Sequence, residues 1–161
     1  MDISVDLQIA CRVDSVPQQA EVQSWLNEAY HAGRRGASGR CDVSVRIVDE
    51  KESRKLNNQY RQQDKPTNVL AFPAGSANDF AALPEDAARP LGDLVICGPL
   101  VEQEAREQGK SPAGHWGHLL IHGMLHLLGY DHETSSQAAE METMEKKILA
   151  ERGFQDPYRE R

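Results

Sequence analysis

Residues 118–132 read His-Leu-Leu-Ile-His-Gly-Met-Leu-His-Leu-Leu-Gly-Tyr-Asp-His, and they are the most informative segment of the sequence. Their apolar content is typical of a buried helix, which would begin at Ser111, a residue type favoured at helix N-caps. Gly129 would end the helix, because glycine readily adopts the left-handed conformation found after helix C-termini. His122 and His126 are four residues apart, so both rings are expected on one face of this helix.

A third histidine, His132, follows the turn that Gly129 is expected to make. The turn would swing the chain back, so the rings of His122, His126 and His132 are expected to meet at one point. Three histidine ligands leave a coordination position open for water or substrate, as in catalytic zinc sites. Zinc lowers the pKa of a bound water from about 15.7 to about 7 and polarises phosphoryl or carbonyl oxygens. The spacing therefore predicts a catalytic metal centre, with zinc or a related ion as the cofactor.

The simpler interpretation is that these histidines are core residues with ordinary hydrogen bonds. The chain has six histidines, and four of them fall within residues 118–132 among leucines and isoleucines. Burying several imidazoles without a ligand would leave unpaired nitrogens at about 1–3 kcal/mol each, which favours the metal site. His118, one turn before His122, is expected beside the ligands or near the substrate rather than as a fourth ligand. His115 lies off this face and is given no role.

The spacing His-x3-His-x5-His, with glycine three residues after the second histidine, matches the metzincin protease pattern. In those proteases a glutamate follows the first histidine and serves as the general base. Here that position is Gly123, which cannot transfer a proton. The pattern therefore argues against peptide hydrolysis by that mechanism.

Hydrophobic periodicity divides the rest of the chain into strands and helices. Four strands are predicted, at residues 3–9, 41–48, 68–73 and 91–97. Five helices are predicted, at residues 18–32, 49–60, 99–108 and 111–128 and from residue 134 onward. Capping boxes are expected at Asp49 with Glu52 and at Thr134 with Gln137. The order β-α-β-α-β-β-α-α-α predicts one layered α/β (α+β) domain over residues 1–161, with residues 74–90 as a long exposed loop.

Composition limits the possible surroundings and partners of the protein. The net charge of −7 argues against a large non-specific nucleic-acid footprint, although it leaves room for a local basic patch. The apolar stretches are too short to span a bilayer, and the N-terminus does not resemble a signal peptide, so we expect a cytoplasmic protein with no membrane partner. The three cysteines show no Cys-x-x-Cys spacing and are expected as reduced, packed thiols.

The histidine segment 122–132 resembles the signature of the YbeY family, bacterial metal-dependent endoribonucleases of rRNA maturation. Further blocks resemble the family in the same order and cover essentially the whole chain: residues 56–61, 64–73, 91–96 and 153–158. Asn68 and Ala71 depart from the common Thr-Asp-Val-Leu-Ser-Phe-Pro block. These departures bear on substrate preference at that strand and not on the metal site.

The resemblance implies a mixed four-stranded sheet flanked by about five helices, with one zinc ion on His122, His126 and His132. It also implies single-strand-specific cleavage of RNA, maturation of the 16S rRNA 3′ end and a part in ribosome quality control. The implied partners are single-stranded RNA and the small ribosomal subunit with its rRNA, and ribosome-associated proteins are further candidates.

The family's invariant arginine falls on Arg61. Its planar fork suits the paired oxygens of a phosphate, so with zinc it would share the charge that develops on the phosphoryl group. From the pattern alone, Arg61 would instead be an exposed helix-end residue that stabilises the macrodipole. Lys65 and Thr67 are candidate contacts to the RNA backbone.

Two other classes of protein stay open on the sequence. One is a metal hydrolase that acts on another bond, such as a peptide or a small ester. The other is a non-catalytic, zinc-stabilised assembly factor that docks on a ribosomal subunit. A closed four-ligand site completed by His118 would favour the assembly factor.

Overall fold

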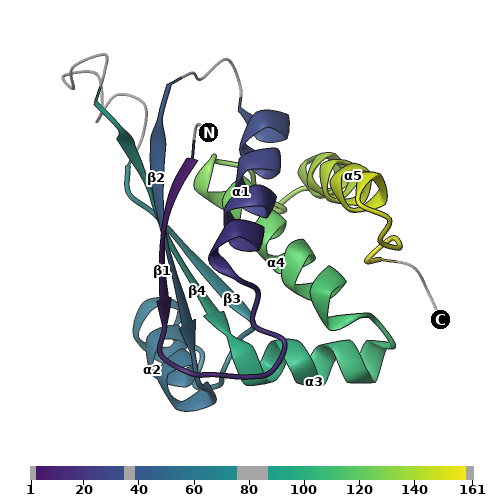
Figure 1. The fold of residues 1–161 in the computed structure, drawn as a ribbon. Coiled ribbons are helices and arrows are strands. Elements are labelled where there is room, and N and C mark those ends of the chain that lie inside the picture. The colour runs from purple at the N-terminus through teal and green to yellow at the C-terminus, as the bar shows by residue number, and fades with distance from the viewer. Residues whose placement is uncertain (1–2, 35–38, 76–86, 159–161) are drawn as a thin grey trace.

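A mixed four-stranded sheet forms the centre of the computed structural model, which describes residues 3–34, 39–75 and 87–158 (Figure 1). The strands are β1 (Ile3–Ile9), β2 (Cys41–Val48), β3 (Val69–Pro73) and β4 (Arg89–Cys97). Their spatial order is β1-β2-β4-β3, in which β1, β2 and β4 are parallel and β3 runs antiparallel to β4. The predicted mixed sheet is therefore confirmed.

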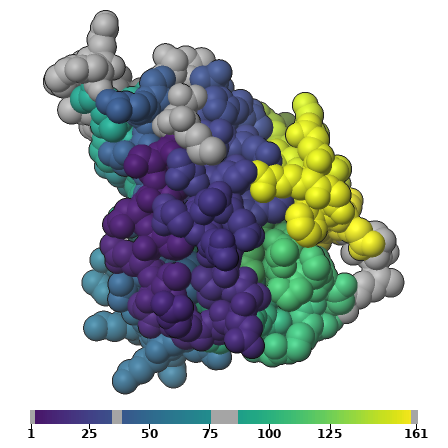
Figure 2. Space-filling model, viewed as in Figure 1, coloured from purple at the N-terminus to yellow at the C-terminus, as the bar shows by residue number. Residues whose placement is uncertain are grey.

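Five helices surround this sheet in the described residues, also as predicted. They are α1 (Gln19–Gly33), α2 (Glu50–Arg61), α3 (Gly98–Gln108), α4 (Pro112–Leu127) and α5 (Ser135–Glu151). Helices α1 and α4 cover one face of the sheet, and α2 lies against the other side (Figure 1). Helix α5 packs against α1, and the two lie side by side on the surface shown in Figure 2.

The main core lies between α1, α4 and the sheet because each of these elements presents one apolar face. The inward residues of β2 alternate along the strand: Cys41, Val43, Val45 and Ile47. The buried stripe of α1 follows helical spacing: Val22, Trp25, Leu26, Ala29 and Tyr30. A smaller cluster on the opposite face lies under α2 and contains Val48, Leu70 and Val95.

The predicted helix starts are observed, with one difference at α2. Thr134 and Gln137 form the full capping box at the start of α5. The Asp49 side chain accepts from the backbone N–H of Glu52 at 2.8 Å, as a cap should. The Glu52 side chain, however, pairs with Arg46 at 2.7 Å. Arg46 on β2 thus pairs with the Glu52 carboxylate, which was predicted to complete the capping box.

Strand β4 begins two residues earlier than predicted, at Arg89. Pro90 suggests a break, yet the Arg89 N–H donates to the carbonyl of Arg40 at 2.9 Å and extends the parallel ladder. Most of the expected loop at residues 74–90, namely residues 76–86, lies outside the described residues.

Two expectations from composition can be compared with the structure. The three cysteines are thiols, and Cys41 and Cys97 are buried. No helix in the described residues has the length and apolar character needed to cross a membrane.

Helix α4 approaches α1 closely at Gly117. A Cβ atom at this position would lie 2.5 Å from Cζ2 of Trp25, whose ring is itself buried. Real Cβ atoms do not approach other atoms so closely, so a methyl group here would push the two helices apart.

We therefore expect Gly117→Ala to lower the free energy of unfolding by about 1–3 kcal/mol, as overpacked cores do. The sign of this change in stability is diagnostic, because alanine normally stabilises a helix interior by about 0.5–1 kcal/mol relative to glycine. Urea denaturation measures the change, and Ser136→Ala at an exposed position of α5 is the control. A Gly117→Ala variant as stable as the wild type would contradict the close approach.

Candidate metal centre

Helix α4 and the turn after it position the histidines. Ser111 caps the helix by accepting from the Gly114 N–H at 3.1 Å. At the other end Gly129 has a φ of +99°, the conformation that the sequence predicted for it. The Tyr130 N–H then donates back to the carbonyl of Leu125 at 3.0 Å, which closes the turn.

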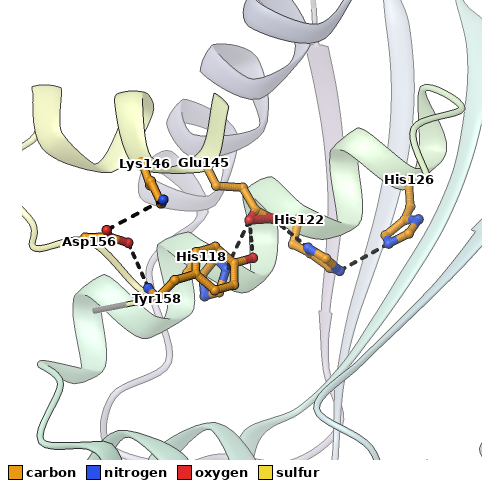
Figure 3. Close-up of polar contacts among 7 residues, drawn as sticks. All are labelled: His118, His122, His126, Glu145, Lys146, Asp156 and Tyr158. Carbon is orange, nitrogen blue, oxygen red and sulfur yellow. Dashed lines mark hydrogen bonds and ion pairs between the residues drawn. The ribbon is translucent and has the colours of Figure 1, made fainter. Parts of the chain in front are cut away.

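The structure brings His122, His126 and His132 together. The Nε2 atoms of His122 and His126 are 3.1 Å apart, and their rings lie edge to face with centroids 4.6 Å apart (Figure 3). The ring centroid of His132 lies 5.8 Å from that of His122 and 5.1 Å from that of His126. One nitrogen from each ring lies within 4.8 Å of the others, so the three side chains can share an ion.

The donor set suits a transition metal. Ligands about 2.1 Å from a tetrahedral ion stand about 3.4 Å apart, close to the observed separation of the two Nε2 atoms. Metal binding also needs neutral imidazole. Burial, assisted by the neighbouring His122 and His132, lowers the pKa of His126 to about 4, so this ring is neutral near pH 7.

The histidines border a cavity of about 240 Å³, and Arg61 and Thr67 line the same cavity. The two positions that depart from the family block, Asn68 and Ala71, also lie on its wall. Lys65 is not among the described residues that line it; its backbone carbonyl accepts from a side chain of α2, and its own side chain is exposed. Arg61 and Thr67 are thus placed beside the histidines, and Lys65 is not.

A buried carboxylate on α5, which the sequence analysis missed, contacts this group. Glu145 is 0% exposed, and its Oε1 lies 2.5 Å from Nδ1 of His122. Its Oε2 accepts from the Tyr158 hydroxyl and lies 3.4 Å from Nε2 of His118. Burial alone would raise the pKa of Glu145, but hydrogen bonds from His118 and His122 outweigh burial and lower the pKa to about 2. The carboxylate therefore remains ionised.

A signal for Glu145 was present in the sequence. The last helix has an apolar seam through Met141, Met144 and Ile148, and Glu145 lies on the same stripe. Glutamate is almost never fully buried unless it is paired, so a charged residue in such a seam indicates a buried partner. Tyr158 belongs to the terminal block 153–158, but no periodicity there showed what its hydroxyl would contact.

The two remaining histidines of α4 have ring centroids 6.2 Å apart but different partners. His118 is 9% exposed and directs its Nε2 toward Tyr158 and Glu145, so it lies beside the three-histidine group. His115 is buried and bonds Glu104 at 2.9 Å, away from the cavity lining. The position expected for His118 agrees with this arrangement.

Gly123 packs against the sheet. A Cβ atom at this position would lie 2.8 Å from Cδ2 of Leu94 on β4. A side chain at this position would need Leu94 to shift, and Gly123 also lines the cavity beside the histidines. Glycine offers no group that transfers a proton, which is the argument against the protease mechanism.

Fold and site together define a class of protein: an α/β layered domain with three convergent histidines and an arginine around an open cavity, as in metal-dependent hydrolases. Comparison with known proteins narrows this class. The family model described as Endoribonuclease YbeY matches residues 8–153, and the chain belongs to this family. The resemblance seen in the sequence is thereby confirmed.

Individual relatives are similar over most of their length. The Endoribonuclease YbeY of Halorhodospira halophila is 54% identical over 147 residues, which cover 91% of each chain. That of Alkalilimnicola ehrlichii is 48% identical over 161 residues, covering 99% of this chain and 92% of the relative. The solution structure of TM1509 from Thermotoga maritima is 25% identical, with a TM-score of 0.57 over 98% of this chain and 100% of that chain.

Removing one histidine tests the shared site. We expect His126→Ala to reduce bound zinc from about one ion per chain to about none, because two imidazoles hold the ion poorly. Stabilisation by added zinc should disappear with it, since binding energy is also folding energy. Elemental analysis and thermal unfolding with and without zinc measure both effects, with His31→Ala on α1 as the control. An unchanged zinc content would remove His126 from the ligand set.

Proposed function

We propose that the protein is a single-strand-specific, zinc-dependent endoribonuclease that acts in 16S rRNA 3′-end maturation and ribosome quality control. The observation that carries this proposal is the cavity in which three histidines and Arg61 face the same space. Its relatives, each named Endoribonuclease YbeY, support RNA as the substrate. His122, His126 and His132 are the proposed ligands.

Each part of the site has a proposed role in cleavage of a phosphodiester. When bound, zinc supplies a Lewis acid and activates the attacking oxygen. Arg61 binds the phosphoryl oxygens through its planar fork and balances the negative charge that develops on them. Positioning and electrostatics dominate phosphoryl chemistry, so no separate protein base is required.

The wall of the cavity opposite the histidines is held in place by α2. Ser53, a buried residue of this helix, donates to the carbonyl of Thr67 and accepts from its N–H, both at 2.9 Å. Asn57, also buried, donates to the carbonyl of Lys65 at 2.8 Å. Arg61 lies at the end of the same helix. These bonds hold the Thr67 backbone at the cavity wall, which supports its proposed contact with the RNA backbone. Lys65 is not among the lining residues and stays a candidate contact.

The size of the cavity supports a single-stranded substrate. A cavity of about 240 Å³ is large enough for part of one strand. Single-stranded segments can also splay their bases out of the way, which a duplex cannot do at low cost.

The orientation of His118 favours an enzyme over a non-catalytic assembly factor. A closed site would need a fourth ligand, yet Nε2 of His118 faces Tyr158 and Glu145. The three-histidine group therefore keeps a side open toward the cavity, as catalytic zinc sites do. We further propose the cytoplasm as its location, with the small ribosomal subunit and associated proteins as partners.

Two substitutions at Arg61, one that removes its charge and one that reverses it, test its proposed role in RNA cleavage. We expect Arg61→Ala to lower the rate of single-stranded RNA cleavage by about 10²–10³-fold, the usual loss for a donor that stabilises transition-state charge. Arg61→Glu should abolish cleavage, while zinc content stays at the wild-type level. Lys55→Glu, at an exposed position of the same helix, reverses a charge without touching the cavity and is the control.

Normal cleavage by Arg61→Glu would exclude the proposed role. If RNA cleavage is lost when the wild-type protein is rigorously purified, a contaminating ribonuclease causes it. The non-catalytic assembly factor would then be the better interpretation. Cleavage of peptide or ester substrates in place of RNA would identify a metal hydrolase that acts on another bond.

A further inference from the structure

Glu145 contacts the three-histidine group from α5 and is not among the described residues that line the cavity. It projects from α5 between His118 and His122, with Tyr158 beside it (Figure 3). A carboxylate oxygen accepts hydrogen bonds and an imidazole N–H donates them. At 2.5 Å, the contact therefore pairs an N–H at Nδ1 of His122 with Oε1 of Glu145.

This arrangement fixes which nitrogen of His122 is free. A neutral imidazole has one N–H and one lone pair, so protonation at Nδ1 leaves the lone pair on Nε2. Nε2 is the atom that lies 3.1 Å from His126. Glu145 thus selects both the tautomer and the ring orientation in which His122 can bind an ion together with His126 and His132.

Glu145 is itself held in place by the C-terminal segment. The Tyr158 hydroxyl donates to Oε2, and Nε2 of His118 lies 3.2 Å from the Tyr158 oxygen. The Tyr158 N–H donates to Asp156 at 2.8 Å, and the other oxygen of Asp156 lies 3.8 Å from Lys146 on α5 (Figure 3). A chain of contacts therefore runs from the segment after α5 to the ring of His122.

We propose that Glu145 is a positioning residue that presents Nε2 of His122 to the metal ion, and that Tyr158 keeps the Glu145 carboxylate in the orientation this requires. The inference rests on the proposed metal centre and adds two residues to it. A carboxylate that orients a ligating histidine typically strengthens metal binding by about 10–100-fold.

A competing possibility is that Glu145 binds an ion directly. His118, His122 and Glu145 also place one ligand atom each within 4.8 Å of one another. The 2.5 Å between Nδ1 of His122 and Oε1 argues against this, because two ligands of one ion stand about 3 Å or more apart. The separation is that of a short hydrogen bond to a charged group.

The affinity of the metal-free full-length protein for zinc tests the proposal. In competition with a chromophoric chelator, we expect Glu145→Gln to raise the Kd for zinc by about 10–100-fold. Tyr158→Phe removes only a hydroxyl from a side chain that is 40% exposed, so it should fold and raise the Kd up to about tenfold. Glu151→Gln, at an exposed position of α5, and Tyr30→Phe on α1 should leave the Kd unchanged.

Nitrogen NMR of the histidines is a second measurement, because it shows which ring nitrogen of His122 carries the proton. A role of Glu145 in stability alone would not change this preference. In the metal-free wild type at neutral pH, His122 should carry its proton on Nδ1, and in Glu145→Gln this preference should weaken. An unchanged zinc Kd in both variants, with His122 still protonated at Nδ1, would overturn the proposal. Two zinc ions per chain, one of them lost in Glu145→Gln, would overturn it in favour of direct ligation.

The same measurements separate this inference from the proposed function. If the wild type binds no zinc, the metal centre fails, while the NMR signature still shows whether Glu145 orients His122. If zinc binds through the three histidines but Glu145→Gln and Tyr158→Phe bind it as tightly as the wild type, only the positioning role fails.

Discussion

The packing of α4 against both α1 and the sheet is the constraint on which the site depends. Two glycines allow it: a Cβ atom at Gly117 would contact the Trp25 ring, and one at Gly123 would contact Leu94 of β4. With two sides of the helix in close contact with the core, a third side carries His122 and His126 to the cavity, and the turn after the helix brings His132 to them. Because packed interiors scarcely deform, the direction of these imidazoles is set by the hydrophobic core.

The other parts of the site come from distant segments, and buried polar contacts connect them. Ser53 connects the segment at Thr67 to α2, and Glu145 connects α5 to His122. Each contact satisfies a group whose burial would otherwise be costly, so losing one partner would destabilise the local arrangement. The apolar core accounts for the stability of the layers, and these few polar contacts set the geometry around the cavity.

Local patterns in the sequence predicted much of this arrangement. Strand alternation and helix periodicity gave the element order, and the spacing of His122 and His126 with the turn at Gly129 gave their convergence with His132. The spatial order of the strands was not predictable, because pairing between distant segments leaves no local pattern. The contact of Glu145 with His122 spans 23 residues, and its one local trace is a charge in an apolar seam.

The burial of Glu145 couples the docking of α5 to the orientation of His122. An ionised carboxylate that is 0% exposed costs several kcal/mol unless its oxygens are paired. Its partners are His118 and His122 on α4 and Tyr158 after α5. Apolar residues hold α5 on the core, and the carboxylate that α5 carries is costly to bury without these partners. The docking of α5 therefore favours the orientation of His122 in which its Nδ1 meets Glu145.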